Sequence, residues 1–432
     1  MPETSDASVT RAAARRTVRA FRWRARRARA ALALKLAPDS FVPQMAAARI
    51  PVDAEVAVYY ADSPERIYQL DQWLPVLERL AATHKVVLIL RDLRTMRDVQ
   101  DRTTLPAVCL TTFLDLMNLF DASEFKVGVY VNNSQRNFQA LNNPRMLHAH
   151  VNHGESDKLS SFSNQVKAYD RVFVAGPVAV ERYREALIAF DDGKVVPVGR
   201  PQLDLDFVPE LPASSRRTVM YGPTWEGESE SNNWTSLDCF GVRIVQGLLS
   251  LPDIRVVYKP HPRVAGSTHP GVRSAHRKIL SLITKANEAD PTAGHLARMD
   301  GNILAMFGQC DALVGDVSSV TLDYLYLRDA PIFLTDRRDD RELLASDSPL
   351  TEGADIVDST TVDGFAAAIS DALANDARRA GRARTRAHYF GDLGPGDSSR
   401  MFEKAVSELI AERDRLLAGH RRVTTGDVDE HD

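Results

Sequence analysis

Two serines, Ser318 and Ser319, stand between a short apolar run at residues 312–314 and an apolar pattern of helical period. This order predicts a strand, a tight turn and a helix. The first backbone N–H groups of a helix have no partner within it, so together with two hydroxyls they offer a binding site for phosphate. An ordinary helix cap would have the same residues, since Ser and Asp are common caps. Asp316 belongs to this candidate phosphate cradle, and Asp323, about one turn into the helix, either faces a ligand or forms a structural ion pair.

A histidine follows another predicted strand. His153 and Gly154 come directly after the apolar run 147–151, and Lys158 lies in the same loop. Loops at the carboxyl ends of parallel strands carry ligand-binding groups in α/β proteins, and an imidazole suits the role of general base. Gly154 allows a ligand to approach the backbone closely. We therefore expect His153 to be a catalytic base; a histidine that caps the next helix is the alternative.

The string Lys-Pro-His-Pro follows a third predicted strand, at residues 254–258. Its two prolines restrict the backbone around His261 and hold that side chain in place. Lys259 supplies a positive charge for a phosphate, and His261 supplies a hydrogen-bond donor. A rigid turn with exposed polar residues is the alternative interpretation.

For three further side chains, the sequence is compatible with either a ligand contact or a structural role. Thr224 and Trp225 end the strand that begins at Thr218. Thr224 either binds phosphate or caps the following turn, and Trp225 either stacks on a base or packs at the rim of the site. Arg400 precedes the last predicted helix, where it either contacts phosphate or belongs to a plain helix start.

Composition limits the class of protein. The 432 residues are 44% hydrophobic and 26% charged, and they carry a net charge of −4, which predicts a globular protein of two domains and does not favour nucleic-acid binding. The three cysteines lack C-x-x-C spacing, and no His, Cys and Asp cluster has the spacing of a metal site. No P-loop or G-x-G-x-x-G motif is present, so ATP and NAD have no sequence anchor and we expect no cofactor.

Short apolar strands alternate with helical stretches along most of the chain, which predicts an α/β fold with parallel sheets. A polar, proline-containing joint divides the pattern into a first domain at 51–208 and a second at 215–418. Two doubly wound halves of similar size predict a ligand cleft between them, at the carboxyl ends of the strands. The polar and acidic end, 419–432, is predicted to be disordered.

The first 50 residues form a basic appendage. Residues 11–35 contain ten Lys and Arg residues and no acid, with aromatic and aliphatic residues between them. This pattern favours a helix that lies on an anionic membrane surface; a disordered basic leader is the alternative. No apolar segment of signal-peptide type follows the basic stretch, so we expect no secretory signal. With no apolar run of about 18 residues either, we expect the protein at the cytoplasmic face of the membrane.

Taken in order, these motifs resemble the CDP-glycerol glycerophosphotransferase family, which builds teichoic acids and related polyol-phosphate polymers. The matching segments, spread over residues 150 to 400, are His153-Gly154 with Lys158, 169–177, 199–201 before Asp204, 221–225, 259–262, 316–320 with Asp323, and 396–400. The loop after His-Gly departs from the family pattern, with Glu155-Ser156-Asp157 in place of the usual threonine-proline.

The resemblance implies a GT-B fold, with two Rossmann-like domains facing a cleft, and phosphoryl transfer from CDP-glycerol or a related CDP-polyol. An acceptor hydroxyl on a polyol-phosphate or lipid-linked chain attacks the phosphorus next to glycerol, and CMP leaves. His153 would take the hydroxyl proton. The pyrophosphate would be held by the remaining polar residues: His261, Lys259, Ser318, Ser319 and Arg400.

Two other functions compete with this one. A GT-B glycosyltransferase or epimerase acting on a UDP-sugar would share the fold and the phosphate cradle. A non-catalytic membrane-bound scaffold in envelope assembly would keep the cleft without the chemistry.

Overall fold

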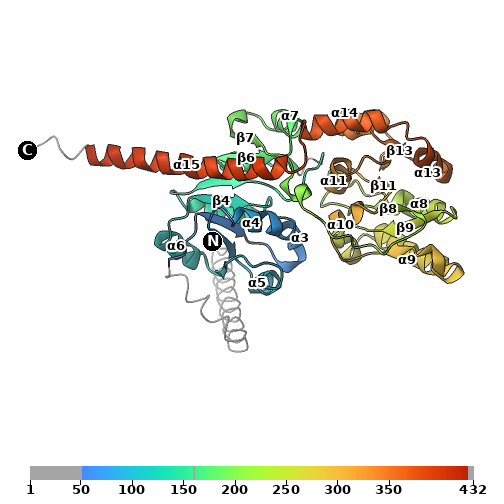
Figure 1. Ribbon diagram of the computed structural model, residues 1–432, viewed down its shortest axis with the longest axis horizontal. Helices are drawn as coiled ribbons and strands as arrows, with labels where there is room; N and C mark the ends of the chain where they lie inside the picture. The colour runs from blue at the N-terminus through green and yellow to red at the C-terminus, as the bar shows by residue number, and fades with distance from the viewer. Residues whose placement is uncertain (1–50, 159–160, 427–432) are drawn as a thin grey trace, which may run out of the picture.

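The computed structural model describes residues 51–158 and 161–426 of the chain. The basic segment 11–35 and the end of the predicted tail therefore lie outside the described residues. The described part folds into two α/β domains, each built on a parallel sheet (Figure 1).

The first domain contains a seven-stranded sheet in the order β3-β2-β1-β4-β5-β6-β7, and every pairing is parallel. Most of its strands are short apolar runs buried on both faces, as expected for a parallel sheet covered by helices. The strands are β1 (Val56–Tyr60), β2 (Val86–Leu90), β3 (Ala107–Cys109), β4 (Val127–Tyr130), β5 (Leu147–His150), β6 (Arg171–Val174) and β7 (Val195–Pro197).

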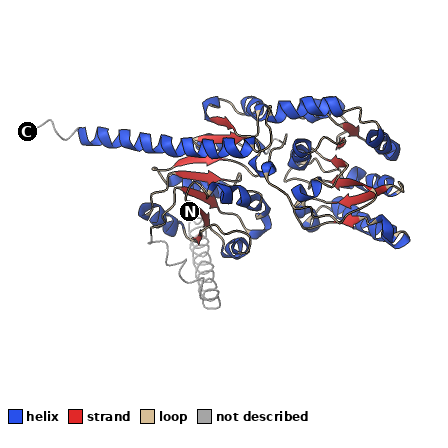
Figure 2. Cartoon of the chain, viewed as in Figure 1, coloured by secondary structure: helices blue, strands red, loops and turns tan. Residues whose placement is uncertain are grey.

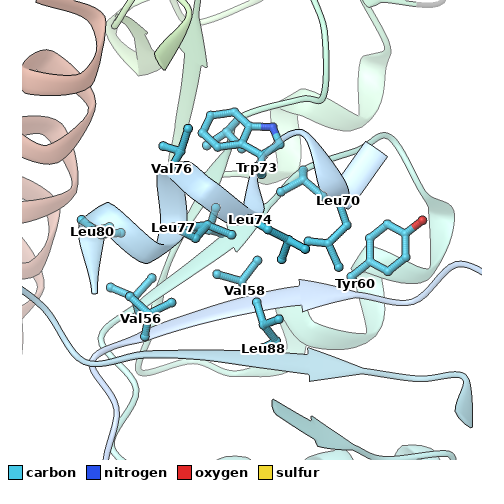
Figure 3. Close-up of a cluster of buried hydrophobic side chains, with 14 of the residues drawn as sticks. Val56, Val58, Tyr60, Leu70, Trp73, Leu74, Val76, Leu77, Leu80 and Leu88 are labelled. Atoms are coloured by element: carbon cyan, nitrogen blue, oxygen red, sulfur yellow. The ribbon is translucent and has the colours of Figure 1, made fainter. Parts of the chain in front are cut away.

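Helices cover both faces of this sheet (Figure 2). They are α3 (Tyr68–Asp71), α4 (Leu74–Leu80), α5 (Leu93–Gln100), α6 (Phe113–Ala122) and α7 (Pro177–Ala186). Figure 3 shows how Leu74 and Leu77 of α4 pack onto Val58 of β1 and Leu88 of β2. This packing fixes the short helices that follow β1, which border the cleft.

The second domain contains a six-stranded sheet in the order β10-β9-β8-β11-β12-β13, again with parallel pairings. Its strands are β8 (Arg217–Gly222), β9 (Ile254–Tyr258), β10 (Leu296–Ala297), β11 (Ala312–Gly315), β12 (Ile332–Thr335) and β13 (Asp355–Val357). Its helices are α8 (Val242–Leu249), α9 (Pro270–Ala289), α10 (Ile303–Phe307), α11 (Ser319–Leu327), α12 (Arg341–Asp347), α13 (Phe365–Ala374) and α14 (Arg379–Phe390).

Both sheets reverse their strand order at the centre, between β1 and β4 in one and between β8 and β11 in the other. At such a switch point the loops that leave neighbouring strands diverge, and a crevice opens at the carboxyl ends of the strands. The sheet topology therefore explains why the polar motifs of the sequence, which follow these strands, gather between the two domains.

The last helix, α15 (Asp397–Gly426), crosses back to the first domain. Figure 1 shows α15 running alongside the first domain. Its residues Phe402, Val406 and Leu409 belong to the same core cluster as residues of β1 and β4. The sequence-based division had placed this helix in the second domain and had begun the tail at residue 419. The structure corrects both points, because the apolar face of α15 covers the first sheet and the helix continues to Gly426.

Among the described helices, none combines the length and the apolar character needed to cross a lipid bilayer.

Candidate active site

A cavity of about 1480 Å³ lies between the two domains. It is lined by the segments that follow β1 and β5 of the first domain, and β8, β9 and β11 of the second. Its volume exceeds the roughly 300–1,000 Å³ of a common small-molecule pocket. The cavity therefore has room for a nucleotide-sized ligand and part of a second substrate.

Two histidines reach the cavity from opposite domains. His153 follows β5 and His261 follows β9, and the ring of Tyr68, at the start of α3, stands edge-on to both. The ring centroids of Tyr68 lie 6.0 Å from His153 and 5.5 Å from His261. The fold thus brings together two residues that are 108 positions apart in the sequence.

Both imidazoles are neutral at pH 7. Burial, with the nearby charge of Arg200, lowers the pKa of His153 to about 4. Burial, with the charges of Lys158 and Arg263, lowers the pKa of His261 to about 3. A neutral imidazole can accept a proton, which is the first requirement of a general base.

Hydrogen bonds give the two rings different roles. Nδ1 of His261 accepts the backbone N–H of Arg263 at 3.2 Å, which places the proton of the neutral ring on Nε2 and makes that atom a donor. Nδ1 of His153 is buried and has no hydrogen-bond partner within the described part of the chain. His153 is therefore suited to accept a proton, and His261 is suited to donate a hydrogen bond.

The loop that carries His153 is held by unusual backbone geometry. Asn152 adopts a left-handed conformation, with φ 52°, and its side-chain oxygen accepts the N–H of His153 at 2.9 Å. Trp73 donates its indole N–H to the carbonyl of Asn152 at 2.6 Å. Asn tolerates this conformation better than most residues because its side chain bonds locally to the backbone.

Two lysines supply positive charge to the cavity. Lys158 of the first domain donates to the Thr224 hydroxyl of the second at 2.9 Å. Burial lowers the pKa of Lys158 to about 8, and it also lowers the pKa of Lys259. The amine of Lys158 is still largely protonated at pH 7. Both lysines line the cavity, where they can pair with a phosphate that enters between the domains.

The structure corrects the interpretation of Asp316 as part of the phosphate cradle. Its two carboxylate oxygens accept hydrogen bonds from the Thr335 hydroxyl at 2.6 Å and from the Thr224 N–H at 2.7 Å. The side chain is fully buried behind the loop, and its negative charge would repel a phosphate. Asp316 therefore shapes the site by fixing Thr224.

Ser318 and Ser319 do line the cavity, at the beginning of α11. Ser318 is the N-cap residue, but its hydroxyl makes no capping hydrogen bond with the described residues, so the helix N–H groups remain available for an anion. A Cβ at position 154 would lie 3.0 Å from Cβ of Ser319, which is tighter than an ordinary contact, so a larger residue would have to shift the His153 loop or the start of the helix.

Besides Asp316, two predicted residues lie outside the cavity. Asp323 forms a buried ion pair with Arg200, N to O 2.8 Å, which is the structural alternative for this residue. The expected phosphate contact of Arg400 is not seen in the structure. Its side chain is 68% exposed and pairs with Asp397, one helical turn away. Each of the two side chains is therefore paired with an opposite charge of the protein, Asp323 with Arg200 and Arg400 with Asp397.

Trp225 lines the cavity, but its ring is already covered on one face. The Arg263 guanidinium lies 3.9 Å from the centroid of the indole, and the His261 ring lies 6.2 Å away. A stacked cation of this kind stabilises the tryptophan side chain at the wall of the site.

Sequence reasoning missed Tyr68, which contacts both histidines. The sequence signal was its place in the segment after a strand of the first sheet, the same signal that identified His153. It also missed Arg66 and Glu228, which pair across the cavity at 3.7 Å. Within residues 51–158 and 161–426, no group of three His, Cys, Asp or Glu side chains could hold a metal ion.

Comparison with known proteins shows the fold. No protein-family model matches the sequence, and no curated protein matches it. Among solved structures, the wall teichoic acid polymerase TagF superposes with a TM-score of 0.54 at 14% identity, over 84% of this chain and 90% of that one.

A putative UDP-N-acetylglucosamine 2-epimerase from Listeria monocytogenes gives a TM-score of 0.52 at 13% identity, over 81% of this chain and 95% of that one. The UDP-GlcNAc 2-epimerase from Neisseria meningitidis, bound to UDP-GlcNAc, gives 0.51 at 10% identity, over 83% of this chain and 99% of that one. These likenesses and the two parallel sheets confirm the predicted GT-B-like fold, with two Rossmann-like domains facing a cleft.

Proposed function

We propose that this chain is a transferase that moves a glycerol-phosphate or similar polyol-phosphate unit from a CDP-activated donor to a hydroxyl of a cell-envelope polymer or its lipid-linked precursor. The observation that carries the proposal is the meeting of His153 and His261 across the cleft. His153 is a half-buried base whose Nδ1 has no hydrogen-bond partner among the described residues, and His261 is a half-buried donor. Both lie beside two lysines and a helix N-terminus.

The reaction exchanges one bond to phosphorus for another. An acceptor oxygen forms a bond to the phosphorus that carries the polyol, and the anhydride bond between that phosphorus and the CMP phosphate breaks with its electron pair. The acceptor proton passes to His153, and CMP leaves as an anion. No oxidant or reductant is needed.

The remaining groups stabilise the charge that develops on the phosphates. Nε2–H of His261 donates to a phosphate oxygen, while Lys158 and Lys259 supply positive charge in a partly buried site, where electrostatic interactions are stronger than in water. Ser318 and Ser319, with the first N–H groups of α11, hold the pyrophosphate. The nucleoside lies against the second domain and the acceptor against the first.

The decisive test is CMP release from CDP-glycerol in the presence of a glycerol-phosphate oligomer. Because removal of a general base costs 100- to 10,000-fold in typical enzymes, His153→Gln should lower kcat by about that factor. His388→Gln is the matched control, since His388 is 46% exposed on α14 and pairs with Glu181 outside the cavity. Wild-type rates for His153→Gln would remove it from the mechanism.

A second candidate is supported by the structural likeness to the two UDP-N-acetylglucosamine 2-epimerases. An enzyme of that kind would act on a UDP-sugar and release no CMP. Incubation with UDP-N-acetylglucosamine, followed by separation of nucleotides and sugars, distinguishes the two. Conversion of the UDP-sugar without turnover of CDP-glycerol would replace the polyol-phosphate proposal.

We also propose that residues 11–35 hold the protein on an anionic membrane, where a lipid-linked acceptor is available. Deletion of residues 1–38 should abolish sedimentation with vesicles that contain phosphatidylglycerol, and should leave turnover of a soluble acceptor unchanged. Unchanged sedimentation would place the membrane contact in another part of the chain.

A further inference from the structure

The loop that carries His153 and Lys158 belongs to the first domain, but its far end is held by the second. The Asp157 carboxylate accepts hydrogen bonds from the Ser348 hydroxyl at 2.6 Å and from the Tyr389 hydroxyl at 2.5 Å. All three side chains are buried, with exposures of 7%, 0% and 2%. Hydrogen bonds to a buried charged group are stronger than neutral ones, so this contact is a firm one.

The helix α7 completes the attachment. Arg182 lies 3.3 Å from the second oxygen of Asp157 and donates to the carbonyl of Asp347 at 2.5 Å. At the start of the same helix, a Cβ at position 176 would lie only 2.4 Å from the carbonyl oxygen of Tyr389. The two domains thus fit closely on this side of the cleft, with Asp157 at the centre of the polar contacts.

The other contacts of the loop leave little freedom. Lys158 bonds to Thr224, Gly154 abuts Ser319, and the start of the loop is held by Trp73. His153 lies only four residues before Asp157. The segment between Asp157 and His153 is short and held at both ends. A displacement of the Asp157 carboxylate should therefore also displace the His153 imidazole.

We propose that Asp157 is a positioning residue, which couples the placement of His153 and Lys158 to the docking of the second domain through Ser348 and Tyr389. Asp157, Ser348 and Tyr389 lie outside the cavity and act only through the loop. Displacement of reacting groups by about 1 Å can cost about 100-fold in rate, so a loosened loop should lower kcat while the donor-binding groups of the second domain stay in place.

The test compares two buried tyrosines of the second domain. Tyr389→Phe removes a hydroxyl from Asp157. Tyr324→Phe is the matched control, because its hydroxyl donates to the carbonyl of Cys310 at 3.1 Å, within the second domain. Each variant loses one buried hydrogen bond and keeps its ring, so a general loss of stability would affect both alike.

The first measurement is hydrogen–deuterium exchange of the loop amides, which requires no activity. The N–H groups of His153 and Lys158 are hydrogen-bonded inside the loop and report on its order. We expect Tyr389→Phe to speed their exchange about tenfold, because one hydrogen bond to a charged group is lost. Tyr324→Phe should leave it unchanged. Equal exchange in the two variants would overturn the proposal.

The second measurement, CMP release, rests on the proposed function. Tyr389→Phe should lower kcat about tenfold. The KM for CDP-glycerol should rise less than kcat falls, because Lys158 lies in the loosened loop but Lys259, Ser318 and Ser319 do not. Tyr324→Phe should match the wild type. Faster loop exchange with unchanged kcat would also overturn the positioning role. If the wild type turns over no CDP-polyol, the proposed function fails while exchange still decides the coupling. If Tyr389→Phe does not fold, Ser348→Ala removes the other hydroxyl from the same carboxylate.

Discussion

The ion pair between Arg200 and Asp323 joins the two domains behind the candidate active site. Removal of one of its charges should lower the free energy of unfolding by an amount that follows from the burial of the pair. The side chains are 5% and 4% exposed, and the charged atoms lie 2.8 Å apart. With an effective dielectric constant of about 20, the attraction is roughly 6 kcal/mol. Burial nevertheless raises the pKa of Asp323 although Arg200 acts to lower it, so desolvation opposes this attraction. The pair therefore adds little net stability, but either charge alone is costly.

We expect Asp323→Asn to destabilise the protein by about 3–5 kcal/mol, the usual cost of leaving a buried charge without its partner. Arg200→Met, at the opposite side of the pair, should cost a similar amount at pH 7. The double variant should be more stable than either single variant, because it buries no unpaired charge at this position. Urea unfolding gives these free energies, and Glu408→Gln is the control, since its exposed pair with Lys404 is worth at most about 1 kcal/mol.

The pH dependence separates the two single variants. In Arg200→Met the buried Asp323 carboxylate has no partner and can become neutral by binding a proton. Protonation of an aspartate with an ordinary pKa costs about 4 kcal/mol at pH 7 and about 1.5 kcal/mol at pH 5. The native state then binds one more proton than the unfolded state, so stability rises as the pH falls, by about 1.4 kcal/mol per pH unit. Glu155, whose pKa burial raises to about 7, acts in the same direction when it loses the charge of Arg200.

In Asp323→Asn the unpaired Arg200 cannot become neutral, because a guanidinium stays protonated. The loss of stability caused by Asp323→Asn should therefore change little between pH 7 and pH 5. A double variant less stable than both single variants, or an Arg200→Met penalty that does not shrink at pH 5, would refute the argument from buried charge.

Three further predictions concern the cleft. Tyr68→Ala should lower kcat about 10- to 100-fold because both histidines lose a packing partner, whereas Tyr68→Phe keeps the ring and should stay within about threefold; equal loss in steady-state assays would instead assign the role to the hydroxyl. A plot of kcat/KM against pH should stay level from about pH 5.5 to 7.5, because the pKa of His153 is about 4 and that of Lys158 is about 8, and should fall on either side as the base gains a proton or the amine loses one; an inflection near pH 6.5 would contradict the burial of His153. Gly154→Ala should weaken binding of CMP, measured by calorimetry, because the added Cβ meets Ser319 at 3.0 Å; unchanged affinity would show that the loop can move aside.

The fold was largely predictable because its strands are short, apolar and bounded by polar turns. A buried parallel strand has few alternatives to a continuous apolar run, and residues that follow such runs must gather at one edge of the sheet. His153, His261, Ser318 and Lys259 were found by this reasoning alone, and the structure brings all four to one cavity.

The errors concern contacts that local sequence does not determine. The apolar face of α15 could cover either sheet, and only the three-dimensional course of the chain places Phe402 on the first. Tyr68 carried no more local signal than the other aromatic residues that follow strands. Arg400 was different, because Asp397 three residues earlier already offered a partner at helical spacing.

The contacts between the domains are distributed unequally around the cleft, and this difference has a consequence for its motion. Behind the histidines the domains are joined by buried groups, among them Arg200 with Asp323 and Asp157 with Tyr389. At the cavity they are joined by the hydrogen bond from Lys158 to Thr224 and by an exposed pair at the rim, Arg66 with Glu228. The side chains of that pair are 42% and 71% exposed, and the pairing is worth at most about 1 kcal/mol. We therefore expect an opening motion to break the exposed pair first and to turn about the buried side. Such a turn would separate His261 from Tyr68, while Asp157 would keep the His153 loop attached to the second domain. The general base would then be in place before the donor closes the site.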